Sequence, residues 1–389
     1  MTSLCVVTQQ LGKIISGPGL HAANLVASLV ADGHTVWVVA PEDQRPPGAL
    51  PFSFSGVRRP PIRSHARWFP LSWEFNRAIQ GEIQQHAVEL VHFTDGRDAF
   101  FARLGVPALG NINDIYPTLP RSLAYYRRNY QDWLARWAYY ALARLGERRA
   151  YGRLDVLLAN SRYTAGVIAA QFPELAGRTR VVYKSVDSRR FAPALARRAT
   201  QGAHPPRLLV VGGNLQRKGV PDLIRAAPTV LLTCPQAEFW IAGQDPAIAA
   251  LQALARRLGV EAHFHFSGQR TQAELVELYS QADVFVMPSL DEALGVVFLE
   301  AMSAGTPVIG STAGGIPEII QDGHNGLLTP PSDPPALAGA ILRLLGDPAL
   351  QDRLRQAGLE TARRFSVEKM MGETYSIYQD LLSGVRQRP

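Results

Sequence analysis

Cysteine is nearly absent from this chain, whose 389 residues include only Cys5 and Cys234. Two cysteines in different halves supply neither a disulfide framework nor a cysteine-based metal site. The longest apolar runs also fall short of the ~20 residues that a membrane-spanning helix needs. Because Met1 leads directly into a strand-like run at 4–8, with no basic segment and no long apolar stretch, we expect no secretory signal and a cytoplasmic location.

The sequence also lacks the motifs of several enzyme and binding classes. It contains no nucleophile elbow and no Ser-His-Asp order, and the P-loop pattern G-x-x-x-x-G-K-[ST] is absent. The formal net charge is +7, but no recognisable nucleic-acid-binding module accompanies it. A serine hydrolase, a P-loop NTPase and a nucleic-acid-binding protein are therefore disfavoured, and no metal site is predicted.

What is present is the composition and pattern of a two-domain α/β protein. Hydrophobic residues make up 47% of the chain and charged residues 19%, as in folded globular proteins. Short β-rich runs alternate with longer amphipathic segments, which predicts doubly wound parallel sheets with helices on both faces. The predicted strands lie at 4–8, 36–40, 90–93, 106–110, 156–159, 208–211, 239–242, 263–266, 284–287 and 308–310.

Residues 191–206 interrupt this alternation with prolines, glycine and several arginines, and we predict a linker there. The first domain is then expected at 1–190 and the second at 207–365, with a helical segment from about 366 to 389. Two doubly wound domains that face each other leave a cleft at the carboxyl ends of both sheets, where ligands tend to bind. Loops that follow strands are therefore the informative ones.

Two glutamates, Glu292 and Glu300, are separated by seven apolar or small residues. If residues 295–304 form a helix, eight steps of ~1.5 Å place the two carboxylates roughly 12 Å apart along its axis, about the length of a nucleotide sugar. Glu292 then suits the sugar and Glu300 the ribose. Backbone NH groups at the start of this helix, those of residues 295–297, suit a diphosphate. The alternative is an ordinary amphipathic helix with two solvated acids.

A glycine-rich basic loop follows the predicted strand 208–211. It runs from Gly212 and Gly213 to the adjacent Arg217 and Lys218. Glycines allow the backbone to approach a ligand closely, arginine can bind two phosphate oxygens at once, and lysine supplies a point charge. We therefore predict that this loop binds a diphosphate.

A second glycine pattern occurs near the start of the chain, where Gly17, Gly19 and Ala22 fit G-x-G-x-x-A with an acidic residue twenty positions further on. This spacing is the best case for a competing class, the NAD(P)-dependent oxidoreductases. A dinucleotide fingerprint follows its strand at once, however, whereas seven residues intervene here. We favour a glycine loop that overhangs the interdomain cleft and precedes a helix at 20–31.

Residues 121–153 are rich in arginine and aromatic residues. Eight arginines stand against Asp132 and Glu147, a net charge of +6, and eight tyrosines and tryptophans are interspersed among them. This composition is typical of a membrane-surface element, which predicts peripheral contact with the inner face of the membrane. The alternatives are a long surface helix with its aromatic side chains in the core, and a different acidic partner.

Taken in order, these motifs resemble the retaining nucleotide-sugar glycosyltransferases of family 4, also called glycosyl transferases group 1. The resemblance covers nearly the whole chain and is strongest after about residue 205. The segments that carry it are 211–219, 288–292, 300–302, 305–309, 314–320, 322–328 and 330–333.

The resemblance implies a GT-B fold, in which two Rossmann-like domains enclose a cleft and the C-terminal helix crosses back to the first domain. It implies metal-independent, retaining transfer of a sugar from a UDP-, GDP- or ADP-sugar to a carbohydrate, lipid-linked or small-molecule acceptor. The nucleotide sugar is a substrate, and no cofactor is implied. The residues expected to bind this donor are Gly17, Gly19, Gly213, Arg217, Lys218, Glu292, Gly295, Val296, Val297 and Glu300.

The implied mechanism is front-face attack, in which the leaving phosphate accepts the proton of the acceptor while Arg217 and Lys218 stabilise the developing charge. The chain departs from the family pattern at Gly213, where an arginine is usual. It departs again at Asn113 and Asp114, where many relatives carry a His-Asp pair. These two residues join Glu292, Arg217 and Lys218 as catalytic candidates. Because of Asn113, a sugar-nucleotide epimerase or hydrolase, or a noncatalytic nucleotide-sugar-binding protein, is the alternative.

Overall fold

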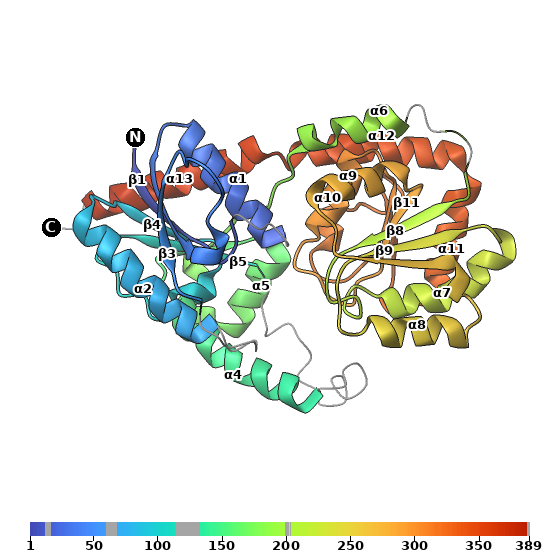
Figure 1. The fold of residues 1–389 in the computed structure, drawn as a ribbon, viewed down its shortest axis with the longest axis horizontal. Helices are drawn as coiled ribbons and strands as arrows, with labels where there is room; N and C mark the ends of the chain where they lie inside the picture. Colours follow the sequence, from blue (N-terminus) through green and yellow to red (C-terminus); the bar gives the residue numbers. More distant parts are fainter. Residues whose placement is uncertain (12–16, 60–67, 114–132, 199–201, 203, 387–389) are drawn as a thin grey trace. The chain divides into compact units, whose positions relative to one another are not determined.

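The computed structural model describes residues 1–11, 17–59, 68–113, 133–198, 202 and 204–386. The chain divides into two compact units (Figure 1), a first unit of Met1–Lys184 with Glu368–Pro389 and a second unit of Ser185–Val367. Each unit contains one sheet of parallel strands whose order reverses near the middle, the arrangement of a Rossmann-like domain. The predicted α/β class with two doubly wound domains is therefore confirmed.

The first unit is built on a sheet with the strand order β3-β2-β1-β4-β5-β6-β7. Side chains of α2 and α4, such as Phe75 and Tyr151, join Val7 and Phe93 in a buried core on one face of the sheet. The strands are β1 (Ser3–Val7), β2 (Thr35–Pro41), β3 (Ser53–Val57), β4 (Leu90–Phe93), β5 (Ala108–Ile112), β6 (Val156–Ala159) and β7 (Thr179–Val181). The helical segments are α1 (Gly17–Ala31), η1 (Glu42–Gln44), α2 (Trp68–Gln85), η3 (Gly96–Ala99), α4 (Trp133–Tyr151), α5 (Arg162–Gln171) and η5 (Pro173–Arg178).

The last helix, α13 (Val367–Arg386), belongs to the first unit although it follows the second in the chain. Its Tyr378 hydroxyl donates a 2.5 Å hydrogen bond to Nδ1 of His92 on β4, and His92 Nε2 donates to the Asn111 side-chain oxygen at 2.6 Å. Burial lowers the pKa of His92 to about 4, so the imidazole is neutral at neutral pH. A buried polar chain thus joins α13 to the middle of the first sheet.

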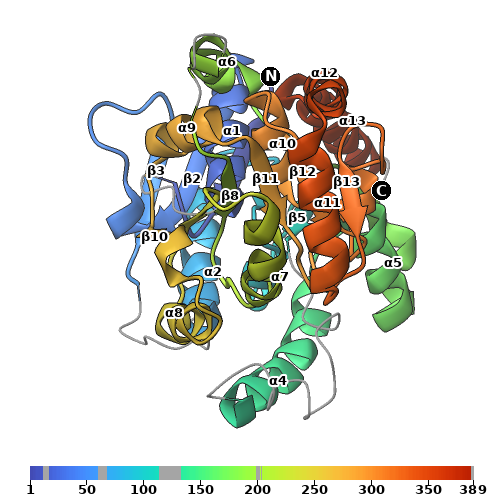
Figure 2. The same ribbon diagram turned by 90° about the vertical axis from the view of Figure 1, so that its right-hand side faces the viewer.

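The second unit is built on a sheet with the order β10-β9-β8-β11-β12-β13. Helices α7, α8 and α11 supply buried side chains to the core on one face, and α9 and α10 lie on the other (Figure 2). The strands are β8 (Arg207–Val211), β9 (Glu238–Ala242), β10 (Phe264–Gly268), β11 (Val284–Met287), β12 (Val308–Ser311) and β13 (Leu327–Thr329). The helical segments are η6 (Ser188–Phe191), α6 (Ala192–Arg198), α7 (Val220–Thr233), α8 (Ile248–Arg257), η7 (Glu261–His263), α9 (Gln272–Gln281), α10 (Val296–Ser303), η8 (Ile316–Glu318), α11 (Pro334–Gly346) and α12 (Pro348–Arg364).

Local sequence explains where these elements begin. The central strand β11 is fully buried and reads as a continuous apolar run, as parallel strands covered on both faces do. Helix α9 begins at a capping box, in which Thr271 and Glu274 satisfy each other's backbone NH groups. Helix α11 begins with Asp333 as its N-cap and a proline in the first turn, where a missing NH costs nothing.

The boundary between the units differs from the sequence prediction. The second unit begins at Ser185 rather than after a linker at 191–206. Within this unit the Val186 NH donates to the Phe365 carbonyl at 2.9 Å. Residues Ala192–Arg198 of the expected linker form helix α6, which packs against α9. Pro193 does not mark a linker, because it lies in the first turn of this helix, where proline is tolerated.

The described part of the arginine-rich stretch 121–153 is helix α4. Not all of the apolar side chains of α4 pack into the core of the first unit: Leu134 is 57% exposed and Leu145 is 71% exposed. Arg148 and Arg149 are exposed as well. Among the described helices, none is both long enough and apolar enough to cross a bilayer.

Candidate functional site

The loops after β8 and β11 leave the second sheet at the point where its strand order reverses. Chains that leave two such neighbouring strands diverge to opposite faces, and the crevice between them is the usual ligand site of this architecture. The two loops contact each other here, because the Leu290 NH donates to the Arg217 carbonyl at 2.8 Å. Gly219 makes the contact possible: its φ is +76°, and a Cβ at this position would lie 2.0 Å from the Pro288 carbonyl oxygen.

A buried ion pair joins the two loops. The Lys218 ammonium donates to the Glu292 carboxylate, and the two residues are 8% and 7% exposed. They are 74 positions apart in the sequence. The sequence prediction gave the diphosphate to Lys218 and the sugar to Glu292; the structure places the two groups in direct contact at one end of the crevice.

The backbone of Glu292 is held by the loop that follows β12. The Gly315 NH donates to the Glu292 carbonyl at 2.8 Å. Gly314 has a φ of +60°, and a Cβ there would lie 2.0 Å from the same carbonyl oxygen. The glycine pair therefore supports the acidic loop through close backbone packing.

Arg217, next to Lys218 in the basic loop, is half-buried. Its guanidinium donates to the Asp291 carbonyl at 3.4 Å, so it too is drawn toward the acidic loop. Gly213, which replaces the usual arginine, is exposed, and a Cβ there would meet only the Gln244 carbonyl oxygen at 3.7 Å. The space at this position is compatible with a ligand or a side chain from outside the loop.

Helix α10 begins directly after the acidic loop. Gly295 precedes it in a left-handed conformation with a φ of +92°, and Val296 and Val297 form its first turn. Backbone NH groups in a first turn have no acceptor within the helix and are available to an anion. Glu300 lies one turn further on and is buried, where the Tyr279 hydroxyl donates to its carboxylate at 2.9 Å. Burial raises the pKa of Glu300 above its ordinary value, while the Tyr279 hydrogen bond and the charge of Arg190 oppose that shift.

The glycines of the first unit differ from the prediction. Gly17 and Gly19 belong to the first turn of α1 rather than to a loop before it. Gly17 is exposed with open space around it, but Gly19 is buried against the side chain of Gln10. Residues 12–16 of the expected loop lie outside the described residues. The roles of both glycines in donor binding stay predictions.

Asn113 follows β5 and is buried. Its side-chain amide donates to the Thr94 carbonyl at 2.8 Å, and its backbone carbonyl accepts from the side-chain amide of Asn160 at 3.0 Å. Among the described residues, its side-chain oxygen has no hydrogen-bond partner. Asp114 lies outside the described residues, so the structure does not place the second half of the pair. Their catalytic roles stay predictions.

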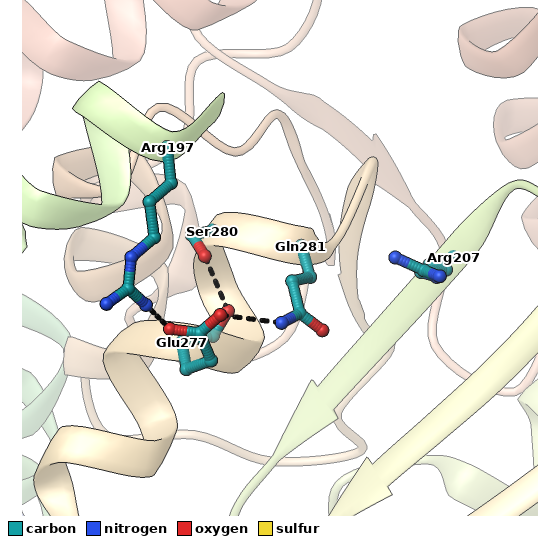
Figure 3. A pocket seen from close by; sticks show the side chains of 5 residues that line it. All are labelled: Arg197, Arg207, Glu277, Ser280 and Gln281. Atoms are coloured by element: carbon teal, nitrogen blue, oxygen red, sulfur yellow. Dashed lines mark hydrogen bonds and ion pairs between the residues drawn. The ribbon is translucent and has the colours of Figure 1, made fainter. Parts of the chain in front are cut away.

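A hollow of about 350 Å³ lies elsewhere on the second unit (Figure 3). It is lined by Arg207, the first residue of β8, and by side chains of α6 and α9, where Arg197 and Glu277 form an ion pair. Because the basic loop follows the opposite end of β8, this hollow is not part of the crevice described above.

Sequence spacing did not indicate two residues that act on Glu300: Tyr279 donates to its carboxylate, and the charge of Arg190 opposes the rise of its pKa. Tyr279 comes from α9, 21 positions earlier, and Arg190 comes from η6 at the start of the second unit. Neither belongs to a glycine-rich or acidic motif, so spacing carried no signal for them. Only the packing of α9 and η6 next to α10 brings them to the site.

Two family models match the chain. The model described as "Glycosyl transferases group 1" matches residues 196–361, and the one described as "Glycosyltransferase Family 4" matches residues 15–190. Between them they match most of both units, apart from the returning helix α13, and the first of them contains the basic loop, Glu292 and Glu300.

Curated relatives match over part of their length. The chain is 35% identical over 260 residues to D-inositol 3-phosphate glycosyltransferase of Streptomyces bingchenggensis, covering 62% of this chain and 56% of that protein. It is 33% identical over 264 residues to the GDP-mannose-dependent alpha-(1-6)-phosphatidylinositol monomannoside mannosyltransferase of Mycolicibacterium smegmatis, covering 64% and 68%. The match thus spans little more than half of the first relative.

Solved structures share the fold over the whole chain. Sucrose-phosphate synthase from Thermosynechococcus elongatus has a TM-score of 0.81 at 22% identity, with 99% of this chain and 100% of that chain covered. An Anabaena protein, Alr3699/HepE, solved in complex with UDP-glucose, has a TM-score of 0.72 at 20% identity, with 98% and 100% covered.

Proposed function

Because the chain belongs to glycosyltransferase family 4 and has the GT-B fold, we propose that it is a retaining glycosyltransferase that uses a nucleotide-sugar donor. The observation that carries this proposal is the buried Lys218–Glu292 pair at the topological switch point of the second sheet. A cationic turn and the first turn of α10 flank the same crevice, which suits a diphosphate. Glu300, eight residues beyond Glu292, suits a ribose.

In the proposed reaction Arg217 and Lys218 hold the donor diphosphate, together with the NH groups of Val296 and Val297. The acceptor hydroxyl attacks the anomeric carbon on the face that the diphosphate leaves, and its proton passes to the departing phosphate oxygen. The new glycosidic bond forms as the sugar–phosphate bond breaks, with the anomeric configuration retained. Fixed cations at the developing charge lower the barrier without a resident metal.

The proposed donors are UDP-, GDP- and ADP-sugars, and the proposed acceptor is a carbohydrate, a lipid-linked glycan or a small polyol. Three observations on relatives support this range: one is named for GDP-mannose, one neighbour was solved with UDP-glucose, and another with ADP. Relatives named for inositol phosphate and phosphatidylinositol mannoside favour a polyhydroxylated acceptor.

The proposal predicts that incubation with one of these donors and an acceptor releases the nucleoside diphosphate. Glu300→Ala should lower the affinity for that nucleotide by about tenfold, because a charged acceptor of hydrogen bonds is worth roughly 1.5–3 kcal/mol. Enzyme-coupled detection of the released nucleotide and calorimetry measure the two effects.

Radiolabelled donor sugar separates the alternatives. Label in a larger product supports transfer; label in free sugar or in an epimerised donor would show a hydrolase or an epimerase. Tight binding with no turnover of any donor would show a noncatalytic protein, and unchanged affinity in Glu300→Ala would remove the ribose role of that residue.

We further propose that α4 brings the protein into peripheral contact with anionic lipid on the cytoplasmic face of a membrane. Leu134 and Leu145 are eleven residues apart, three helical turns, so they share one face of α4 with Arg148 and Arg149. Apolar side chains among exposed arginines are typical of helices that lie on anionic bilayers.

Co-sedimentation at low salt with vesicles of phosphatidylglycerol and phosphatidylcholine tests this contact. Wild type is expected to pellet with the anionic vesicles and to stay in solution with phosphatidylcholine alone. Leu145→Asp should lose most of the binding, whereas Leu232→Asp, at an 88% exposed leucine of α7, should keep it. Equal loss in both variants, or no binding by wild type, would rule out the contact.

A further inference from the structure

Glu300 faces α9, not open solvent. The Tyr279 hydroxyl donates to Oε2 of its carboxylate at 2.9 Å, and Tyr279 itself is fully buried. A carboxylate taken out of water stays charged only where donors or cations replace the lost hydration. The residue proposed to bind the ribose therefore depends on a partner from a different helix.

Tyr279 is held in place by one backbone hydrogen bond and two ring contacts. Its backbone carbonyl accepts from the Thr306 hydroxyl at 2.7 Å. Its ring meets Phe191 edge-on with 5.9 Å between the centroids, and Phe285 of β11 lies 5.7 Å away. A ring fixed in this way sets the direction of its hydroxyl, and hence the orientation of the Glu300 carboxylate.

The segment 188–198, which forms η6 and α6, attaches this arrangement to α9. Phe191 supplies the ring contact, and the Arg190 guanidinium donates to the Gln272 side-chain oxygen at the start of α9 at 3.2 Å. In the middle of α9, Glu277 forms an ion pair with Arg197 of α6 (Figure 3). The segment thus contacts the start and the middle of the helix that carries Tyr279.

We infer that Tyr279 is the positioning residue for the ribose end of the donor and that it acts by orienting Glu300. The inference rests on the proposed function, since it assumes that Glu300 accepts hydrogen bonds from the ribose hydroxyls. It adds Tyr279 to the site, a residue outside the segments that carry the family resemblance.

The electrostatics give this arrangement a pH dependence. Burial raises the pKa of Glu300, and the two groups that oppose the shift are the Tyr279 hydroxyl from α9 and the Arg190 guanidinium from η6. Loss of either group raises the pKa of Glu300 further, so the carboxylate takes up its proton at a higher pH. A protonated carboxyl accepts ribose hydrogen bonds less well. As the pH is lowered, the variant should therefore lose its affinity for nucleotide at a higher pH than wild type does.

Calorimetry with UDP, GDP and ADP first identifies a nucleotide that wild type binds. That nucleotide and its 2′,3′-dideoxy analogue are then titrated into wild type, Tyr279→Phe and Glu300→Gln. Wild type should prefer the ribonucleotide by about tenfold, and Tyr279→Phe should lose most of this preference while it binds the dideoxy analogue as wild type does. Tyr151→Phe is the matched control and should keep the preference. It removes another buried tyrosine hydroxyl, which contacts Glu147 in the first unit.

The acid limb of nucleotide affinity against pH is the second measurement. In Tyr279→Phe and Arg190→Gln it should move upward by about one pH unit, the shift expected from the loss of one charge-stabilising contact. A merely structural role would weaken the binding of both nucleotides equally and leave the acid limb of the affinity–pH curve in place. Either result would overturn the inference. If wild type binds none of the three nucleotides, the proposed function itself has failed; if wild type and Glu300→Gln differ as expected but Tyr279→Phe matches wild type, the positioning role alone has failed.

Discussion

A Lys218→Met variant is expected to lose sugar transfer by about 10²–10³-fold and to be less stable by about 3–5 kcal/mol. Both effects come from the buried ion pair. The ammonium is the group proposed to stabilise the leaving diphosphate, and its removal leaves the Glu292 carboxylate, only 7% exposed, without its cationic partner. Urea unfolding measures the stability, and the initial rate of nucleotide release measures the transfer.

Two further variants separate stability from chemistry. Lys218→Met combined with Glu292→Met should recover most of the lost stability, since no uncompensated charge stays buried, and should still be inactive. Arg270→Met breaks the partly exposed pair with Glu274 in the same unit and should cost less than about 1 kcal/mol. Full transfer by Lys218→Met would refute the proposed role, and a stability equal to that of Arg270→Met would refute the importance of burial.

A Gly219→Ala variant should bind nucleotide at least about tenfold more weakly and lose more stability than its left-handed conformation alone explains. The new Cβ would lie 2.0 Å from the Pro288 carbonyl oxygen, so the basic loop and the acidic loop must move apart. That movement displaces Lys218 from Glu292. Calorimetry with a nucleoside diphosphate and urea unfolding give the two values.

Gly259→Ala is the matched control in the same unit. Gly259 has a φ of +70°, close to the +76° of Gly219, but a Cβ there meets nothing within 4 Å. Its substitution should cost only the left-handed penalty of about 1–2 kcal/mol and leave nucleotide binding unchanged. If the two alanine variants behave alike, the close approach of the loops does not hold the site together.

The central strands of both sheets could be predicted because each is an apolar run buried on both faces, as in β8 and β11. Three of the four edge strands were missed, whereas the edge strand β10 was predicted at 263–266. Strand β3 reads SFSGV with mixed exposure, and β7 and β13 have three residues each, so neither hydrophobicity nor length separates them from loops. Their pairing comes from the neighbouring strand, which is information that a local window of sequence does not contain.

The site was predictable as a set of loops but not as a set of contacts. Glycines and charges after strands located the basic loop, Glu292 and Glu300. The direct contact of Lys218 with Glu292 and the hydrogen bond from Tyr279 to Glu300 depend on packing between segments far apart in the chain. The sequence motif also does not show why position 314 is glycine, namely that the backbone of Gly314 packs closely on the Glu292 carbonyl.

The return of α13 to the first unit limits how this protein can be recombined with its relatives. The chain passes between the units twice, after Lys184 and after Val367, so the second unit is an insertion within the first. A chimera that exchanges residues 185–367 as one cassette leaves Tyr378 with its own His92. A single crossover at 184 instead brings in a foreign final helix that must fit the sheet of its new host. Exchange of the second unit by domain shuffling therefore requires two breakpoints.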